Sequence, residues 1–114
     1  MKVDLKSLTI TEARKKLDSK EFTAVELAST YLDEIKKKNG EVNAYLEIFD
    51  DVLEQAKLAD EAISRGEIFP LTGIPLGIKD NILIEGKKVT SGSKILEGFI
   101  APYDATVRQK LKLQ

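Results

Sequence analysis

The sequence contains no cysteine, no histidine and no tryptophan among its 114 residues. Without cysteine, disulfide bonds, thiolate zinc sites and cysteine nucleophiles are excluded. Without histidine, catalytic triads that use an imidazole base are excluded as well. Any general base in this chain must therefore be a lysine, aspartate, glutamate or tyrosine side chain.

The chain also lacks an excess of either charge. Eighteen basic and nineteen acidic side chains give a net charge of −1, and the two signs are interspersed. Direct binding to nucleic acid or to an acidic membrane therefore has no electrostatic support. No apolar run approaches the roughly 20 residues that span a bilayer, and the first residues lack the apolar region of a signal peptide. We expect a soluble cytoplasmic protein, with an organellar location in a eukaryote left open.

Two capping boxes predict helices near the start of the chain. The pattern threonine-x-x-glutamate occurs at residues 9–12 and 23–26, where the threonine hydroxyl and the glutamate carboxylate each bind a free amide. The first box predicts a helix through about Asp18. The second predicts a helix that stops at Asn39–Gly40, where glycine can adopt the left-handed conformation. Helical spacing places four apolar residues on one face of that second helix: Val25, Ala28, Leu32 and Ile35.

A third helix is predicted between Asp50, as its N-cap, and a glycine stop at Arg65–Gly66. Its apolar positions again keep helical spacing: Leu53, Ala56, Ala59 and Ile63. The preceding stretch, 42–49, is rich in apolar and aromatic residues and is predicted to include a short strand or extended segment.

The composition changes after Pro70, because five of the seven glycines lie beyond it. Residues 74–78 and 82–84 are predicted to form strands, and residues 90–93 a polar loop. Asp104 is predicted to cap a last helix that begins at Ala105.

The 114 residues correspond to one domain or part of one. Residues 1–66 are expected to be mainly helical. Residues 67–114 are expected to form a strand and loop segment that ends in a truncated helix. No linker divides the chain convincingly.

Lys79 is the first candidate for chemistry, because it interrupts the apolar residues around 74–78. A lysine amine that is desolvated among apolar side chains loses its proton more readily and can act as a base. The commoner situation is a lysine at a strand end with its head group in water, and the local pattern alone favours that interpretation. Asp80 is expected to face solvent or to cap the turn.

Hydroxyl groups near Lys79 raise a second possibility. Thr90, Ser91 and Ser93 could take part in a serine–lysine arrangement, but clusters of serine and glycine more often form turns. The glycines of this region do not match a dinucleotide or phosphate loop. The carboxylates at 50–51, 60–61 and 85 give only a weak indication of a hydrolase pair or a hard-metal site.

The stretch LTGIPLGIKDNILIEGKKVTSGSKILEGFIAPYDATV, residues 71–107, resembles the segment around the first catalytic residue of the amidase signature enzymes. Within them it is most similar to the A subunits of the glutamyl-tRNA(Gln)/aspartyl-tRNA(Asn) amidotransferases. The first part of the chain resembles those subunits as well, from LTITEARKKLDSKEFTAVELASTYLDEIKKKN through VNAYLEIF. The likeness covers nearly the whole chain, and the combination of GIPLGIKDN, TSGS and YDATV is more specific than any one of them.

The resemblance implies a role for Lys79. In the family, the lysine of the IKDN motif belongs to a Ser–cis-Ser–Lys triad and accepts a proton from a bridging serine. Both serines of that triad lie in a stretch well downstream that this sequence does not contain. Ser91 and Ser93 belong to the motif around the lysine and do not match the missing serines. Residues 108–114 also depart from the family pattern.

The resemblance further implies the reaction and the partners of the full subunit. It would hydrolyse glutamine to release ammonia, and partner B and C subunits would complete a complex that amidates charged tRNA. ATP and magnesium are expected in the B subunit, and no cofactor or metal is expected in this chain. We expect the 114 residues alone to be inactive, because the serines are absent.

For the fold, the resemblance implies an α/β class: N-terminal helices followed by the first strands of a mixed sheet, here incomplete. An incomplete sheet predicts self-association, since it leaves an unpaired edge. Two other functions stay open. The chain could be a short non-catalytic binding module for the partner subunits, or part of another amidase that acts on a small amide.

Overall fold

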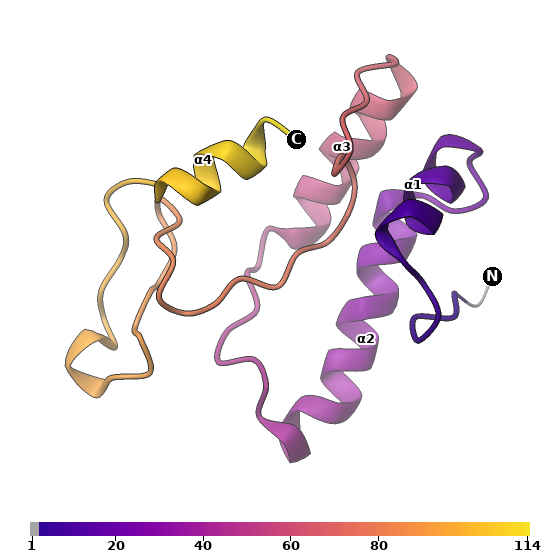
Figure 1. Cartoon of the computed structure of the whole chain (residues 1–114). Helices are drawn as coiled ribbons and strands as arrows, with labels where there is room; N and C mark the ends of the chain where they lie inside the picture. Colours follow the sequence, from indigo (N-terminus) through magenta and orange to yellow (C-terminus); the bar gives the residue numbers. More distant parts are fainter. Residues whose placement is uncertain (1–2) are drawn as a thin grey trace. The chain divides into compact units, whose positions relative to one another are not determined.

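The computed structural model describes residues 3–114 of the chain. Their helices are α1 (Ile10–Asp18), α2 (Ala24–Val42), α3 (Val52–Ser64), the short 3₁₀ helix η1 (Lys94–Leu96) and α4 (Thr106–Lys112). These residues form two compact units that divide between Pro75 and Leu76, with α1, α2 and α3 in the first unit (Figure 1). None of the helices in the described part is both long and apolar enough to cross a membrane.

The first helices begin where the sequence predicts. Thr9 Oγ1 accepts a hydrogen bond from the Glu12 amide at 3.1 Å, which caps α1. At α2 the capping box is complete: the Thr23 hydroxyl accepts from the Glu26 amide at 3.1 Å, and the Glu26 carboxylate accepts from the Thr23 amide at 2.8 Å.

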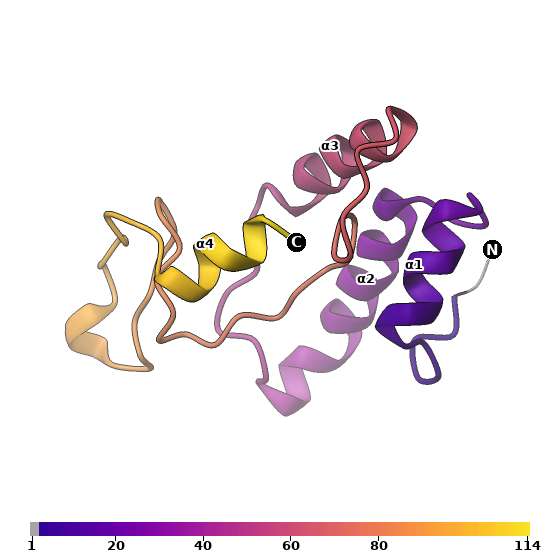
Figure 2. The same cartoon turned by 45° about the horizontal axis from the view of Figure 1, so that its top comes forward.

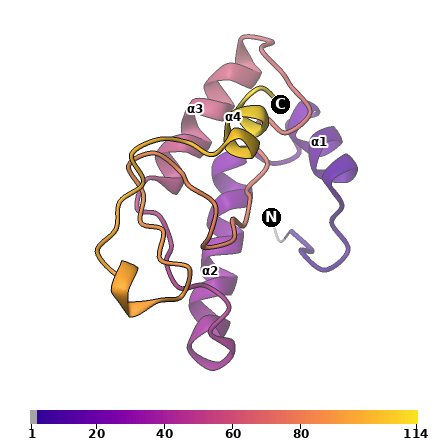
Figure 3. The same cartoon turned by 60° about the vertical axis from the view of Figure 1, so that its left-hand side comes forward.

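Asp60 of α3 completes the N-terminus of α2. Its carboxylate accepts hydrogen bonds from the amides of Ala24 at 2.7 Å and Val25 at 3.1 Å. These first amides of a helix have no partner inside the helix. The capping box and Asp60 together therefore satisfy the free donors of α2 and join it to α3, which lies beside α2 in both views (Figures 2 and 3).

The core of the first unit is small and rich in alanine. Leu17 of α1 and Leu27 of α2 are its largest fully buried side chains. The other buried members are Ala13, Phe22, Ala24, Ala28 and Ala56. Alanine at these positions allows the three helices to approach closely, because its side chain occupies little volume.

The segment after α3 returns to this core at Gly73. Its backbone has φ +81°, and a Cβ atom added there would lie 3.1 Å from the Cβ of Ala24 and 3.3 Å from the Cδ1 of Leu17. Arg14 of α1, which pairs with Asp18 at 2.7 Å, also donates a hydrogen bond to the carbonyl of Thr72. The helices of the first unit therefore hold the chain at Thr72 and Gly73.

The predicted stop of α2 at Asn39–Gly40 is wrong, because the helix continues to Val42. Asn43 takes the left-handed conformation at φ 49°, which asparagine tolerates better than most residues. The side chain of Asn39 then binds the backbone of Tyr45 on both sides, accepting from its amide at 2.8 Å and donating to its carbonyl at 2.9 Å. This contact lies beyond the helix, so the local glycine signal did not reveal it.

The ends of α3 and α4 match the sequence only in part. The end of α3 is confirmed, since Arg65 is its C-cap and Gly66 has φ +76°. Its N-cap is Asp51, one residue after the predicted Asp50. The N-cap of α4 is Ala105, and the predicted Asp104 cap is wrong because that carboxylate binds the Glu85 amide and the Lys112 ammonium.

No strand forms anywhere in residues 3–114. The segments predicted as strands, 42–49, 74–78 and 82–84, have no ladder partner there, and a single antiparallel bridge joins Lys88 to Ile100. Strand formation requires a neighbouring backbone to pair with, and local apolar patterns do not report whether that neighbour is present. The mixed-sheet part of the expected fold is thus not observed within the described residues.

Replacing Asp60 should destabilise the first unit. We expect Asp60→Ala to lower the free energy of unfolding by about 2 kcal/mol, because two partly buried amides lose their acceptor. Asp60→Asn keeps one acceptor oxygen and should cost less. Urea unfolding followed by circular dichroism measures both. Glu61→Ala, which removes the neighbouring exposed carboxylate of the same helix, is the control and should change stability by less than about 0.5 kcal/mol. An equal loss for Asp60→Ala and Glu61→Ala would refute the role of Asp60.

Two glycines with similar backbone angles provide a second test. Gly66→Ala meets no atom within 4 Å, so it should cost only the left-handed strain, about 1 kcal/mol. Gly73→Ala adds an overlap with Ala24 and Leu17, and we expect a total of at least about 2 kcal/mol. The same unfolding experiment compares them. If Gly73→Ala costs no more than Gly66→Ala, close packing at Gly73 is not important for stability.

Candidate active site

Lys79 begins a tight turn at the start of the second unit. Its carbonyl accepts a hydrogen bond from the Ile82 amide at 3.1 Å. The lysine residue is exposed. Residues 3–114 therefore fix the backbone of Lys79 in a turn but do not bury its side chain.

Asp80 accepts hydrogen bonds through both its side chain and its backbone. Its carboxylate accepts hydrogen bonds from the Thr90 amide at 2.9 Å, the Gly92 amide at 3.3 Å and the Thr90 hydroxyl. Its backbone carbonyl accepts from the Ser91 amide at 2.7 Å. These bonds, above all the one from the Thr90 hydroxyl, hold the pKa of the Asp80 carboxyl below its ordinary value of 3.8. Residues 90–92 thus wrap around a carboxylate that their donors stabilise in its charged form.

The backbone of the TSGS loop explains how its amides converge. Ser91 and Gly92 both have positive φ, 51° and 69°, and such turns point successive N–H groups to one side. The Ser93 hydroxyl accepts from the Ile95 amide at 3.3 Å and caps η1. The Thr90 hydroxyl accepts from the Gly92 amide at 3.1 Å and donates to Asp80, so both hydroxyls bind nearby groups, as the turn-forming interpretation predicts.

A second aspartate ties the YDATV motif to the same unit. The Asp104 carboxylate accepts from the Glu85 amide at 2.8 Å and from Lys112 Nζ at 2.7 Å. The neighbouring Ala105 amide donates to the Leu83 carbonyl at 2.8 Å. Lys112 above all, together with the Glu85 amide, lowers the pKa of Asp104.

The three motifs GIPLGIKDN, TSGS and YDATV are therefore physically connected. Asp80 joins the first to the second, and Asp104 joins the residues after the first to the third. The sequence pointed to Lys79 and to the loop hydroxyls, but it did not reveal either aspartate as a link. The available signal was weak, because Asp80 and its partner Thr90 are ten residues apart in the sequence.

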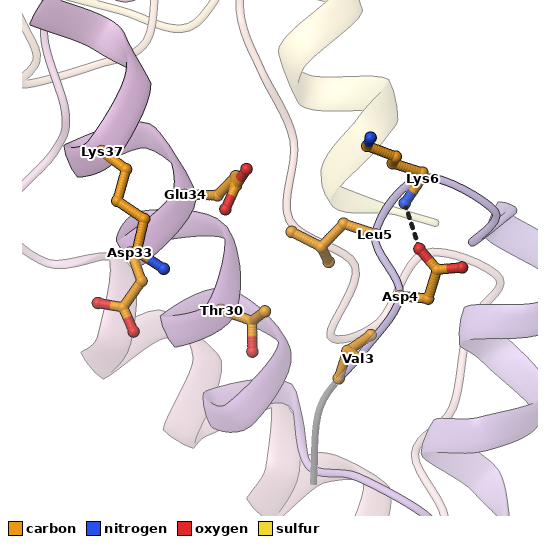
Figure 4. A pocket seen from close by; sticks show the side chains of 8 residues that line it. All are labelled: Val3, Asp4, Leu5, Lys6, Thr30, Asp33, Glu34 and Lys37. Carbon is orange, nitrogen blue, oxygen red and sulfur yellow. Dashed lines mark hydrogen bonds between the residues drawn. The ribbon is translucent and has the colours of Figure 1, made fainter.

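The other candidate groups, a metal site, a carboxylate pair and a pocket, give no indication of a function. The described residues contain no group of three or more acidic side chains placed to hold a metal ion. Asp60, one of the carboxylates considered as a hydrolase pair, is used at the N-terminus of α2. An open pocket of about 850 Å³ lies between residues 3–6 and one face of α2 (Figure 4). Its lining carries carboxylates and ammonium groups of both signs, from Asp4, Lys6, Asp33, Glu34 and Lys37, and gives no consistent preference for a ligand.

Comparison with known proteins gives matches over almost the whole chain. A family model described as Amidase matches residues 26–114. The glutamyl-tRNA(Gln) amidotransferase A subunit of Ruminiclostridium cellulolyticum is 52% identical over 110 residues, which cover 96% of this chain and 23% of the relative. The protein of the same name from Thermoanaerobacter pseudethanolicus is 48% identical over 110 residues, covering 96% of this chain and 22% of that protein.

A solved structure supports the same relationship. The crystal structure of an amidase family protein from Bacillus anthracis superposes with a TM-score of 0.87 at 31% identity, covering 94% of this chain and 22% of that one. The chain therefore spans slightly less than a quarter of the length of the relatives that it matches, in their N-terminal portion.

The bonds of Asp80 predict how the TSGS loop responds to acid. The pKa of Asp80 is lowered in the folded chain, so ionised Asp80 stabilises the loop fully at pH values above its ordinary pKa of 3.8. That contribution is lost as the pH falls through the lower pKa of the folded state. Thr90→Val removes the hydroxyl donor and should raise the pKa of Asp80 toward 3.8, whereas Thr90→Ser should keep it low. The carboxyl carbon of Asp80, followed by NMR during an acid titration, reports the difference. Identical titrations of Thr90→Val and Thr90→Ser would contradict the prediction.

Proposed function

The chain belongs to the amidase family, and on that premise we propose that it forms the N-terminal part of the glutaminase subunit of a tRNA-dependent amidotransferase. The observation that carries the proposal is its 52% identity, over 110 residues, to the A subunit of a glutamyl-tRNA(Gln) amidotransferase. The full subunit would hydrolyse the side-chain amide of glutamine and release ammonia for the amidation of glutamate or aspartate attached to tRNA.

In this proposal Lys79 is the base of the family's Ser–cis-Ser–Lys triad. Its neutral amine would take the proton of a bridging serine, which would in turn take the proton of the serine that attacks the amide carbon. A lysine can serve as a base where imidazole is absent, provided that it is desolvated. Because Lys79 is exposed among residues 3–114, the groups that desolvate it would come from the rest of the amidase chain.

The same reasoning makes the 114 residues inactive by themselves. They would supply the base, while the two serines and the amides that stabilise the oxyanion would come from further along the full-length protein. Large apolar side chains of the second unit are exposed, with Ile95 at 94%, Leu113 at 72% and Tyr103 at 63%. In the proposed full-length protein, other parts of the amidase chain would cover them. Fully formed, this region would join the mixed sheet of an α/β amidase fold.

The proposed partners follow from the place of such a protein in a complex. B and C subunits would bind the full chain, and the B subunit would use ATP and magnesium to activate the carboxylate on the charged tRNA. This chain would itself need no cofactor. The cytoplasmic location expected from the sequence stays a prediction.

The lysine assignment is tested in a chimera, in which residues 3–114 replace the matching N-terminal portion of the Ruminiclostridium cellulolyticum protein in its complex. We expect Lys79→Ala and Lys79→Arg to lower the rate of ammonia release from glutamine by at least about 100-fold. Arginine should not rescue, because its guanidinium does not give up its proton. Circular dichroism should show an unchanged fold.

Lys94→Ala is the matched control, since Lys94 is an exposed lysine of the same unit that lies in η1. Its rate should stay within about twofold of the unmodified chimera. Turnover that survives Lys79→Ala would eliminate Lys79 as the base, and an unmodified chimera without glutaminase activity would argue against the amidotransferase assignment.

A further inference from the structure

Asp80 follows Lys79 directly and is bound on two sides to residues 90–92. We propose that Asp80 is a positioning residue for Lys79: it fixes the lysine backbone by fastening the turn 79–82 to the TSGS loop. This inference rests on the proposed function for its catalytic meaning, whereas the fastening itself is a property of the described chain.

The bonds around Asp80 leave the lysine backbone little freedom. The Lys79 carbonyl is held by the Ile82 amide at 3.1 Å, and the Asp80 carbonyl by the Ser91 amide at 2.7 Å. The peptide groups before and after the Asp80 Cα are thus both tied down. Because the Asp80 side chain is also fixed by Thr90 and Gly92, rotation about the backbone of residue 80 would break several hydrogen bonds at once.

The charge of Asp80 makes these contacts stronger than ordinary loop bonds. Hydrogen bonds to an ionised carboxylate are roughly twice as strong as those between neutral groups. The loop donors are the amides of Thr90 and Gly92 and the Thr90 hydroxyl. Without the carboxylate, these groups would lose their acceptor in the turn, and residues 90–92 would lose their main attachment to it.

A base must lie within hydrogen-bond distance of the proton that it accepts, and a misplacement of about 1 Å can cost about 100-fold in rate. Lysine has a long, flexible side chain, so its reach is reproducible only if its Cα is held still. Fixing the Lys79 backbone through Asp80 would leave only the side-chain torsions to be ordered by the rest of the active site.

Asp104 provides a natural comparison. It is also an aspartate whose carboxylate binds a backbone amide of the same segment, that of Glu85 at 2.8 Å. The two groups that bind its carboxylate are the Glu85 amide and the Lys112 ammonium. They connect residue 85 to α4 and lie outside the turn 79–82. Loss of either carboxylate should loosen the second unit, but only the loss of Asp80 should loosen Lys79.

The first test measures backbone motion in the 114-residue chain by ¹⁵N NMR relaxation. We expect the Lys79 order parameter to lie near that of rigid backbone, about 0.85, and to fall below about 0.6 in Asp80→Ala. In Asp104→Ala it should stay near the unmodified value. An unchanged Lys79 order parameter in Asp80→Ala, or an equal fall in both variants, overturns the proposal.

The second test measures glutamine hydrolysis in the chimera. Asp80→Ala should lower kcat by about 10-fold or more and leave KM within about twofold, because a displaced base slows chemistry without removing substrate contacts. Thr90→Ser, which keeps the hydroxyl donor to Asp80, should retain kcat, and Thr90→Val should lower it. A change in the KM of Asp80→Ala with kcat unaltered, or equal kcat for Thr90→Ser and Thr90→Val, would overturn the positioning role in catalysis.

The two tests separate this inference from the proposed function. If Lys79→Ala leaves the chimera active, the lysine is not the base and its assignment in the proposed function fails, while the relaxation result still decides whether Asp80 holds the Lys79 backbone. If Lys79→Ala abolishes turnover and Asp80→Ala does not alter kcat, the lysine assignment stands and the positioning role fails.

Discussion

The contact between Asp60 and the first amides of α2 is the interaction on which the helical unit depends. A carboxylate at a helix N-terminus satisfies free donors and also opposes the positive end of the helix dipole. Here the carboxylate comes from another helix, so one pair of hydrogen bonds sets both the start of α2 and the position of α3 against it. The small side chains of the core pack closely beside this contact, and Gly73 lies against Ala24 of α2, Leu17 of α1 and Ile63 of α3.

Local signals in the sequence predicted the helices well. Thr9 and Thr23 start their helices as expected, and Gly66 ends α3, because a cap involves residues only a few positions apart. The errors occur where a distant contact decides. The end of α2 depends on Asn39 reaching Tyr45, and Asp104 binds Glu85 and Lys112 rather than capping α4. The predicted strands require a partner backbone that residues 3–114 do not provide.

The candidate site shows the same division. Lys79 was singled out first by its place among apolar residues and then by the family motif, and its turn is closed by a local hydrogen bond from the Ile82 amide. The link from Asp80 to Thr90 spans ten residues and uses a backbone amide, which no side-chain pattern encodes. Lys79 as a base therefore stays a prediction from the sequence, and the carboxylate that links its turn to residues 90–92 was found only in the structure.

The second unit is held together differently from the first, and this has a thermodynamic consequence. Val89 and Ala101 are its only buried apolar residues among those described, and its loops are connected by hydrogen bonds that the carboxylates of Asp80 and Asp104 accept. Exposing little apolar surface on unfolding gives a small change in heat capacity, because apolar hydration is the main positive contribution to it. The stability of residues 76–114 should therefore vary less steeply with temperature than that of the alanine-rich helical unit, and cooling should weaken it less.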